Sequence, residues 1–454
     1  MVTTTRADLY DLTAQARKDR GPVYVLNPQQ LADVPSTMRW DLLAGCQDPE
    51  TAIRRAEPLT AIATFKGEGE EFWSDATTLW LQTLLHVAAL HGGTMDLVHY
   101  WALAKAPEDF LHAVAAAGGE AERWGALVRD QMMSSASKTT DTIRYMLAAD
   151  LAFMLDRRLR EAVTPGPGTF SPERFAAEGG TLYLIAESRD ERPAPVAGVF
   201  AALVTEIYHQ AALAAATMPG GRLDPPMLWA LDEVTQTCPV PGLPSLLADA
   251  GGRGVQIMPV VHCPAQLRTR WGKDGARAIL DTCGTKVFLP GLSDPETLEM
   301  ASKLSGAVAA RERGQEHDTR HPIMTEDMIR QLPVRRDGTG YAFILRNGLL
   351  PVIGRPPVIW HSRRYKKLAR LQARTERALA KVVIPDTIPA GEAWDAIGQG
   401  AAETTTPMPV LVRDPASPVG HAGPTGNGPA AVPRQRGIRP ARKARPWDQI
   451  GGQP

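Results

Sequence analysis

Apolar positions follow two different periodicities along the chain, and the change between them divides the sequence into regions. From about residue 49 to residue 163 they recur at helical spacing, and a single helix is expected from about Thr140 to Glu161. Another helix is indicated by Trp80, Leu81, Leu84, Leu85 and Ala88 and ends at Gly92-Gly93. We therefore expect an all-α domain over residues 46–165.

Short apolar runs separated by helical segments take over after residue 166. Strands are expected at 23–26, 181–186, 227–231, 255–261, 285–289 and 341–345. Helices are expected at 8–17, 196–218, 243–249, 275–281 and 295–304. Strand–helix alternation of this kind predicts parallel βαβ units with right-handed crossovers, and hence an α/β fold class.

The stretch PPMLWALDEV, residues 225–234, carries the clearest candidate chemistry. The apolar run 227–231 is typical of a strand buried on both faces, which places Asp232 and Glu233 at its carboxyl end. Open α/β sheets bind their ligands at that edge. Four hydrophobic residues followed by Asp-Glu form a Walker B pattern, in which the Asp holds Mg²⁺ and the Glu orients or deprotonates water. The alternative is a core strand with an acidic exit loop.

Composition excludes several other classes of protein. The 454 residues contain 50 basic and 50 acidic side chains, so bulk charge gives no argument for nucleic-acid binding. The four cysteines are widely spaced without a CxxC pair, which indicates neither a zinc site nor a disulfide framework and favours a reducing cytosol. The N-terminal residues are polar, unlike a signal peptide, and the apolar segment 196–218 is interrupted by Glu206, His209 and Gln210.

Two basic clusters lie near the C-terminal end. A basic helix is expected over 363–384, and its candidate nucleic-acid contacts are Arg363, Arg364, Lys366, Lys367 and Arg370. The Pro/Gly-rich stretch 385–454 is expected to be a disordered tail, with a second basic cluster at 434–445. Solvated surface is one interpretation of both clusters, and contact with phosphate backbone or anionic lipid is the other.

Taken in order, several segments resemble one protein family. They are VTTTRADLYDLTAQAR (2–17), GPVYVLNPQ (21–29), GGTLYLIAE (179–187), LWALDEV (228–234), LPSLLADAGGRGVQI (243–257), AQLRTRWG (265–272) and KVFLPGLSDPETLEMASKLSG (286–306). This set is similar to the C-terminal two-thirds of type IV secretion coupling proteins of the TraG/TraD family, over roughly residues 2–360.

The resemblance implies a RecA-like nucleotide domain interrupted by the all-α domain. Residues 1–45 would begin that domain, residues 166–362 would complete it with Walker B, and the basic helix and tail would follow. It also implies ATP and Mg²⁺ as cofactors, with Asp232 as the magnesium ligand, and a hexamer that drives export of DNA or a nucleoprotein. Implied partners are single-stranded DNA or a relaxase–DNA complex and the secretion-channel proteins. The implied location is cytoplasmic, at the inner face of the cell membrane, through partners or a missing N-terminal anchor.

The sequence departs from the family in three places. No GxxxxGK[ST] loop occurs in the 454 residues, so the phosphate-cradling amides and lysine must come from elsewhere. The family's DPKGDL-like stretch is TTRADL (4–9) here, and His262-Cys263 replaces its Gln-Ser pair. The family's N-terminal transmembrane helices have no counterpart in these residues. We therefore expect a segment or a late start of a longer motor, or one half of a split one.

Two further residues acquire roles from the resemblance. Arg253, in the turn 251–254, would be an arginine finger that acts on a neighbouring subunit's nucleotide. A surface arginine that stabilises the turn or touches DNA phosphate is the alternative. His262 would replace the family's glutamine as a hydrogen-bond donor near the γ-phosphate, or would be structural.

Three functions remain compatible with the sequence. The first is an ATP-driven DNA or nucleoprotein translocase assembled with a P-loop. The second is a non-catalytic recruitment module with a vestigial nucleotide site. The third is a DNA-pumping ATPase of the FtsK/HerA type. Whether the chain is itself an enzyme depends on the missing loop.

Overall fold

The computed structural model describes residues 1–61, 70–104, 107–132, 137–188, 193–310, 319–334, 339–363, 365–367 and 370. The predictions for Arg364, for most of the basic helix and for the tail with its basic cluster at 434–445 lie outside these residues.

A five-stranded parallel sheet forms the centre of the fold, in the order β2-β3-β1-β4-β5. Its strands are β1 (Val2–Thr4), β2 (Val23–Leu26), β3 (Thr181–Ile185), β4 (Met227–Leu231) and β5 (Val255–Pro259). The expected parallel α/β architecture is confirmed for this part of the chain. The three-residue strand β1, which the apolar pattern does not indicate, occupies the middle of the sheet.

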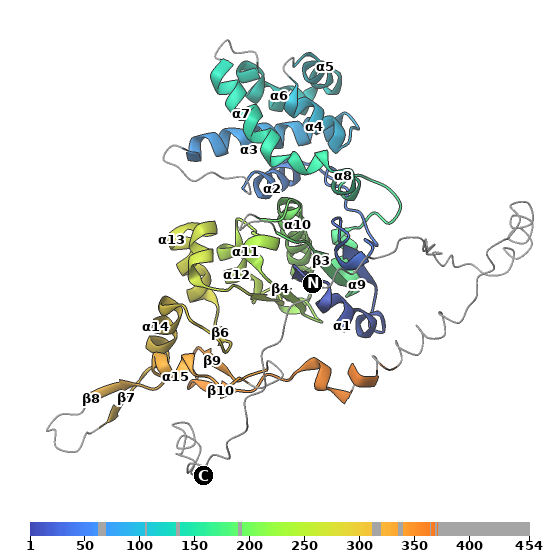
Figure 1. Ribbon diagram of the computed structural model, residues 1–454. Coiled ribbons are helices and arrows are strands. Elements are labelled where there is room, and N and C mark those ends of the chain that lie inside the picture. The colour runs from blue at the N-terminus through green and yellow to red at the C-terminus, as the bar shows by residue number, and fades with distance from the viewer. Residues whose placement is uncertain are drawn as a thin grey trace, which may run out of the picture. The chain divides into compact units, whose positions relative to one another are not determined.

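Helices pack around this sheet (Figure 1). They are α1 (Asp8–Lys18), α9 (Pro172–Glu178), α10 (Ala197–Ala216), α11 (Val234–Thr237), α12 (Leu243–Ala250) and α13 (Pro264–Thr282). Short 3-10 turns lie at Leu31–Asp33 and Pro219–Gly221. Helix α13 is longer than the expected 275–281 and is interrupted at Gly272, where φ is +70°.

Helix α10 is long and apolar enough to pass a length-and-composition test for a membrane span. Most of its residues are buried in the protein, however, and the ion-paired Glu206 lies in its middle. These two observations are typical of a core helix.

The segment between β2 and β3 is helical, as expected. It contains α2 (Pro49–Thr60), α3 (Glu70–Leu90), α4 (Met95–Leu103), α5 (Glu108–Ala117), α6 (Gly119–Met132), α7 (Ser137–Asp150) and α8 (Arg157–Ala162). Trp80, Leu81, Leu84, Leu85 and Ala88 of α3 are all fully buried, so the apolar stripe does form the core.

The prediction of one continuous helix over residues 140–161 is wrong. Helix α7 ends at Asp150, a 3-10 turn covers Ala152–Leu155, and α8 begins after Asp156. The backbone of Asp156 is extended, and its carboxylate accepts hydrogen bonds from the amides of Arg158 and Leu159 at 2.7 and 3.4 Å. An N-cap at this position starts a new helix and ends the periodic pattern that suggested one continuous element.

The last predicted strands are real but do not extend the parallel sheet. Strands β6 (Thr285–Phe288), β9 (Ala342–Arg346) and β10 (Val352–Gly354) form a separate antiparallel sheet, in the order β10-β9-β6. Phe288 and Phe343 stack in the small core between this sheet and α14 (Pro295–Leu304) and α15 (Glu326–Arg330). Strands β7 (Ala307–Ala310) and β8 (Thr319–Pro322) form a two-stranded ribbon, and a 3-10 turn at Ile359–His361 follows β10.

Candidate functional site

The acidic pair lies at the carboxyl end of β4, where the sequence places it. Asp232 follows the last residue of β4, and its backbone is held from two sides. Its amide donates to the carbonyl of Thr3 at 3.3 Å, and its carbonyl accepts from the hydroxyls of Thr3 at 3.1 Å and Thr237 at 2.9 Å. These bonds fix Asp232 between β1 and α11.

Glu233 adopts a conformation that is unfavourable for a residue with a side chain. Its φ of +46° and ψ of +48° are left-handed, and it serves as the N-cap of the short helix α11. A single non-glycine residue in this region costs about 1–2 kcal/mol. Strained backbone at the carboxyl edge of a sheet is typical of a functional position rather than of a packing residue.

His262 is brought to the same place by the sheet. Because β4 and β5 are parallel and Leu231 pairs with Pro259, the residues that follow both strands emerge at the same edge. The Nε2 atom of His262 lies 3.6 Å from Oε1 of Glu233, and its amide donates to Oε1 of Gln266 at 3.0 Å. The His262 side chain is 71% exposed, so a ligand can reach it. Asp232, Glu233 and His262 thus form one cluster.

The charge environment of Asp232 suits a cation. Burial, and next the charge of Glu233, raise the pKa of its carboxyl group above the ordinary value, and Asp8 adds a further negative contribution. Within the described part of the chain, no arginine or lysine forms an ion pair with it. A divalent ion at this point would relieve the repulsion among these carboxylates.

Magnesium is the ion that this donor set fits. Among the described residues, no group of three or more His, Cys, Asp or Glu side chains is arranged as a complete metal site. Mg²⁺ does not need one, because it keeps several waters and is usually bound by one or two carboxylates together with substrate phosphates. Asp232, with its half-buried and unpaired carboxylate, is the residue that would hold it.

Arg253 lies at the opposite end of β5 from this cluster. It precedes the first residue of the strand, whereas His262 follows the last, and five extended residues span about 16 Å. Its guanidinium is paired with the carboxylate of Asp249, which also accepts from the hydroxyl of Tyr208 at 2.6 Å. Arg253 therefore cannot serve the acidic cluster of its own chain, and its assignment as a finger in trans stays a prediction.

Among the strand edges of the described residues, those of β5 and β6 are considered as possible pairing sites. Strand β5 pairs only with β4, and β6 pairs only with β9. Apolar side chains on and beside these edges are more than half exposed, namely Met258, Val287 and Leu289. An additional strand could pair with either edge, since each presents free backbone groups.

The remaining site predictions concern the basic helix. The described basic residues are all exposed, namely Arg363, Lys366, Lys367 and Arg370. Exposure is expected both for a nucleic-acid contact and for a solvated surface.

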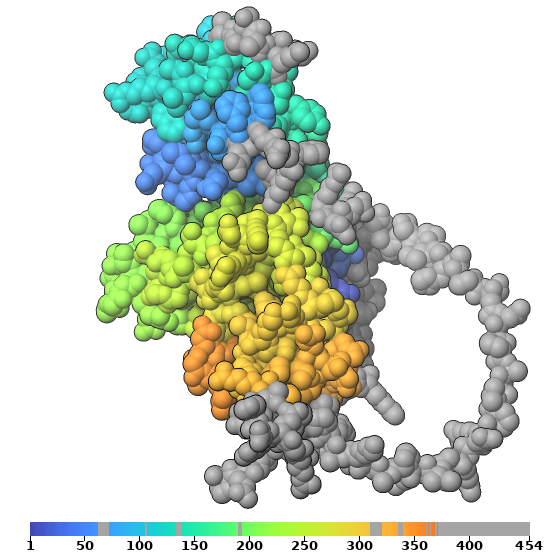
Figure 2. Space-filling view, turned by 90° about the vertical axis from the view of Figure 1, so that its left-hand side faces the viewer, coloured from blue at the N-terminus to red at the C-terminus, as the bar shows by residue number. Residues whose placement is uncertain are grey.

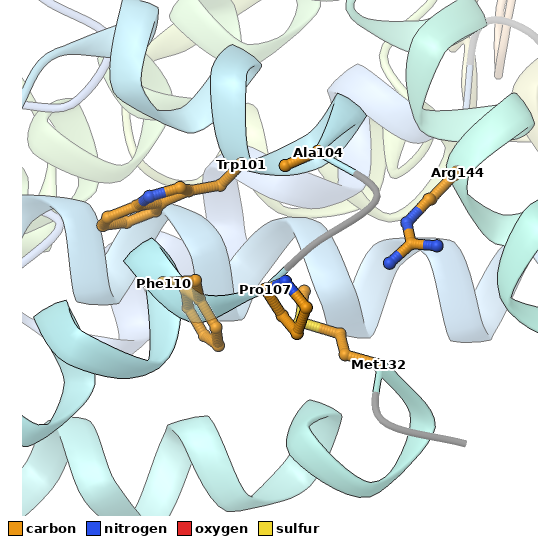
Figure 3. A pocket seen from close by; sticks show the side chains of 6 residues that line it. All are labelled: Trp101, Ala104, Pro107, Phe110, Met132 and Arg144. Carbon is orange, nitrogen blue, oxygen red and sulfur yellow. The ribbon is translucent and has the colours of Figure 1, made fainter. Parts of the chain in front are cut away.

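A small pocket in the helical domain is unrelated to the acidic cluster. It lies between α4, α5, α6 and α7 and has no room for a water molecule (Figure 3). We interpret it as a packing gap. Its lining residues are Trp101, Ala104, Pro107, Phe110, Met132 and Arg144.

Sequence reasoning missed the threonines that position the acid pair. Thr3 and Thr237 are buried, their hydroxyls are 3.3 Å apart, and both hold the backbone of Asp232. They lie 234 positions apart, and only the pairing of β1 with β4 brings them together. The one available signal was the polar run Thr3-Thr4-Thr5 in a segment that resembles a sheet strand of a known family.

Comparison with protein families identifies part of the chain. Residues 226–334, which include Asp232, Glu233 and His262, match the model described as the TraM recognition site of TraD and TraG. This match supports the resemblance to type IV coupling proteins of the TraG/TraD family. The segment that matches this family runs from β4 through α15 and so contains Asp232, Glu233, Arg253 and His262. A search among curated proteins finds no match.

Solved structures share the fold of this chain. The bacterial conjugative coupling protein TrwBdeltaN70, in its unbound monoclinic form, is 17% identical with a TM-score of 0.57, over 79% of this chain and 78% of that one. TrwB in complex with the ATP analogue ADPNP gives the same values. TrwB in complex with ADP and Mg²⁺ is 16% identical with a TM-score of 0.53, over 79% and 84%. The RecA-like α/β fold expected from the sequence is confirmed.

Proposed function

We propose that this chain is the coupling-protein segment of a conjugative type IV secretion motor, which drives DNA or nucleoprotein translocation with ATP when it acts together with a P-loop. The observation that carries the proposal is the cluster of Asp232, Glu233 and His262 at the carboxyl edge of the parallel sheet, within the segment that matches the TraG/TraD family. The nucleotide and Mg²⁺ that occur with TrwB support ATP and magnesium as the cofactors here.

The roles of the clustered residues follow from their positions. Asp232 would hold Mg²⁺, which supplies charge neutralisation at the phosphates. Glu233, beside Asp232 and 27% exposed, is placed to orient or deprotonate a water molecule. His262 contacts Glu233 and can donate a hydrogen bond to a phosphate oxygen at the same edge.

The open edge of β5 supports the requirement for a further segment. A P-loop follows a strand, and such a strand would pair with the edge of β5 and place its loop beside Asp232 and His262. Apolar side chains exposed at β5 and β6 would then be covered. The proposal includes a hexamer, channel proteins and a relaxase–DNA complex as partners, and a location at the cytoplasmic face of the membrane.

A recruitment module is the second candidate, because the matching family model is named for recognition of TraM rather than for hydrolysis. In that case the acidic cluster would not be used. An FtsK/HerA-type pump remains a third candidate, and the match to TraD and TraG favours the coupling protein over it.

Transfer of DNA between cells separates the first two candidates. Glu233→Gln should lower transfer at least about 10²-fold if Glu233 acts as a general base. Glu299→Gln, which alters an exposed acid paired only with Lys303, is the matched control and should leave transfer unchanged. Normal transfer with Glu233→Gln, at equal protein levels, would favour the recruitment module.

A further inference from the structure

A cleft of about 350 Å³ opens beside α13, and Asp232, Glu233 and His262 are not among the residues that line it. One wall comes from the helical domain, through Ala61 after α2 and Ser74 of α3. The other comes from the segment that follows α11 and from α13 itself, which lies on the surface seen in Figure 2. This volume is within the range of about 300–1,000 Å³ of small-molecule sites. The residues that line it are Ala61, Ser74, Pro239, Pro241, Pro244, Arg270, Trp271 and Gly272.

Among the described residues, Arg270 is the only charged one that lines this cleft. Its Nε atom donates to the carbonyl of Thr235 at 3.2 Å, and the described residues give its two terminal amino groups no partner. Burial lowers its pKa, and no carboxylate of the described residues opposes that effect. The neighbouring arginines of α13 differ, since Arg268 is paired with Glu296 and Arg277 with Asp281. A half-buried guanidinium without an anion is unusual, because desolvating a charge is costly unless it is paired.

The rest of the cleft is rigid and largely apolar. Pro239, Pro241 and Pro244 have fixed backbone torsions, and the Trp271 indole is held by a 2.8 Å hydrogen bond from Nε1 to the carbonyl of Val240. Ser74 adds a hydroxyl on the opposite wall. Such a site offers one strong anion contact beside flat apolar surfaces.

We propose that this cleft binds a phosphate group carried by a nucleotide or by a single nucleic-acid strand, with Arg270 as the principal contact. A guanidinium presents parallel donors that match two phosphate oxygens, and its free amino groups can supply them. A base or sugar can pack on Trp271 and the prolines, as aromatic platforms do in single-strand binding sites. Asp232, Glu233 and His262 do not line this cleft, so binding there can be measured without hydrolysis at Asp232.

Phosphate suits the cleft better than the carboxylate of an acidic peptide. An extended peptide needs unpaired backbone donors or acceptors along a groove, and the proline residues of this wall have no amide hydrogen to offer. The two phosphate sources differ in size and charge, so they can be told apart by titration. An acidic peptide is the alternative that the experiment must exclude.

The experiment is a titration of the full chain with three phosphate probes and one peptide. Fluorescence anisotropy would follow a labelled oligothymidylate of about six nucleotides at low salt. Thymidine monophosphate, inorganic phosphate and a glutamate-rich peptide would each compete for it. Arg270→Gln should weaken oligonucleotide binding about 10–100-fold, the effect of losing a charged hydrogen-bonding group. Arg277→Gln removes an equal charge from the exposed part of the same helix and should change binding less than about 3-fold.

A second variant shows whether any loss of binding by Arg270→Gln is caused by misfolding. Ser74→Trp fills the cleft from α3 while leaving Arg270 in place, and it should weaken binding to the same degree. If thymidine monophosphate displaces the labelled probe as well as unlabelled oligonucleotide does, the site binds a free nucleotide. If the oligonucleotide displaces it more strongly, the site binds a nucleic-acid strand. Three results would overturn the proposal: unchanged binding by folded Arg270→Gln, an equal loss with Arg277→Gln, or preferential competition by the acidic peptide.

Discussion

Asp232 and Glu233 both occupy unfavourable positions, and the two costs have different causes. Glu233 is held in the left-handed region, with φ at +46°. Asp232 keeps a negative charge in a half-buried place beside two other carboxyl groups. Both features lower the stability of the fold, so they are not expected of residues that serve stability alone. They are expected of residues that bind a cation.

This interpretation predicts the stability of Asp232→Asn. The folded state raises the pKa of Asp232, so the folded protein binds its proton more tightly than the unfolded protein does. Ionised Asp232 therefore destabilises the fold at neutral pH, and that penalty disappears as the pH falls through the raised pKa. Asp232→Asn should melt at a higher temperature than the wild type at neutral pH, and the difference should vanish in acid.

Thermal unfolding of the two proteins between about pH 4 and pH 7 measures this difference. Asp281→Asn is a suitable control, because Asp281 is 72% exposed and paired with Arg277 on the surface. A lower melting temperature for Asp232→Asn at neutral pH would indicate a structural role for the carboxylate.

The position of the two acids could be predicted from the sequence, but the threonines that hold Asp232 could not. A run of apolar residues that ends in Asp-Glu identifies the carboxyl end of a buried strand, because strand burial and polarity are both local properties. Thr3 and Thr237 hold Asp232 through contacts across the sheet. Such contacts depend on which strands become neighbours, and no local pattern encodes that choice.

At the scale of elements, a buried ionic network joins α2 to α10. Glu206 is 3% exposed and contacts Nε of Arg54 at 3.2 Å and Nε of Arg55 at 3.6 Å. It also accepts from the amide of Gln210 at 3.0 Å. Arg55 lies over the ring of Trp40 and donates to the carbonyl of Leu42 at 2.6 Å. The network ties the helical segment between β2 and β3 to a helix that packs on the sheet.

Glu206→Gln should therefore be strongly destabilising. Removing one partner of a buried ion pair leaves an uncompensated charge, at a cost of about 3–5 kcal/mol. Glu299→Gln removes one partner of the exposed pair with Lys303 and should cost less than about 1 kcal/mol. Chemical denaturation of the wild type and the two variants gives these free energies directly.

The pH dependence gives a second test of the same network. Burial raises the pKa of Glu206, but the hydrogen bond from Gln210 and the charges of Arg55 and Arg54 outweigh it, so the net pKa is lowered. Its contribution to stability is present above the ordinary value of 4.5 and is lost as the pH falls through the lower folded value. Equal acid sensitivity of wild type and Glu206→Gln would contradict this assignment.

Element boundaries were predictable where caps and turns mark them, and strand partners were not. The break near Asp156 was missed because an apolar stripe continues across it, although Asp is a common N-cap. Strand β6 was expected to be parallel because it follows a helix. The Asn347-Gly348 turn between β9 and β10, with Gly348 at φ +77°, is a hairpin signal that could have indicated the antiparallel sheet.

For the whole molecule, the position of Arg253 leads to a prediction about subunits. It lies at the end of β5 opposite to the acidic cluster, so a nucleotide on which it acts would have to belong to a neighbouring chain. In the assembled motor, Arg253→Lys should reduce turnover about 10³–10⁵-fold and leave nucleotide binding nearly intact. Mixing Arg253→Lys with Asp232→Asn subunits should restore part of the activity, because some interfaces would combine an intact site with an intact arginine.

Hydrolysis measured over a series of mixing ratios, with mixed assemblies confirmed by mass, checks this prediction. Recovery at intermediate ratios is the expected result. No recovery at any ratio would rule out a role in trans and would favour Arg253 as a residue that stabilises its turn through Asp249.

In the proposed function, Asp232 and Glu233 form half of a nucleotide site, and a separate segment supplies the GxxxxGK[ST] loop that these 454 residues lack. Calorimetric titration of Mg·ATP tests it most directly, on the chain alone and on the chain assembled with a segment that carries a P-loop. We predict no micromolar binding by the chain alone, and binding by the assembly with hydrolysis that Asp232→Asn abolishes. Micromolar binding by the chain alone, or hydrolysis by the assembly that survives Asp232→Asn, would contradict the claim.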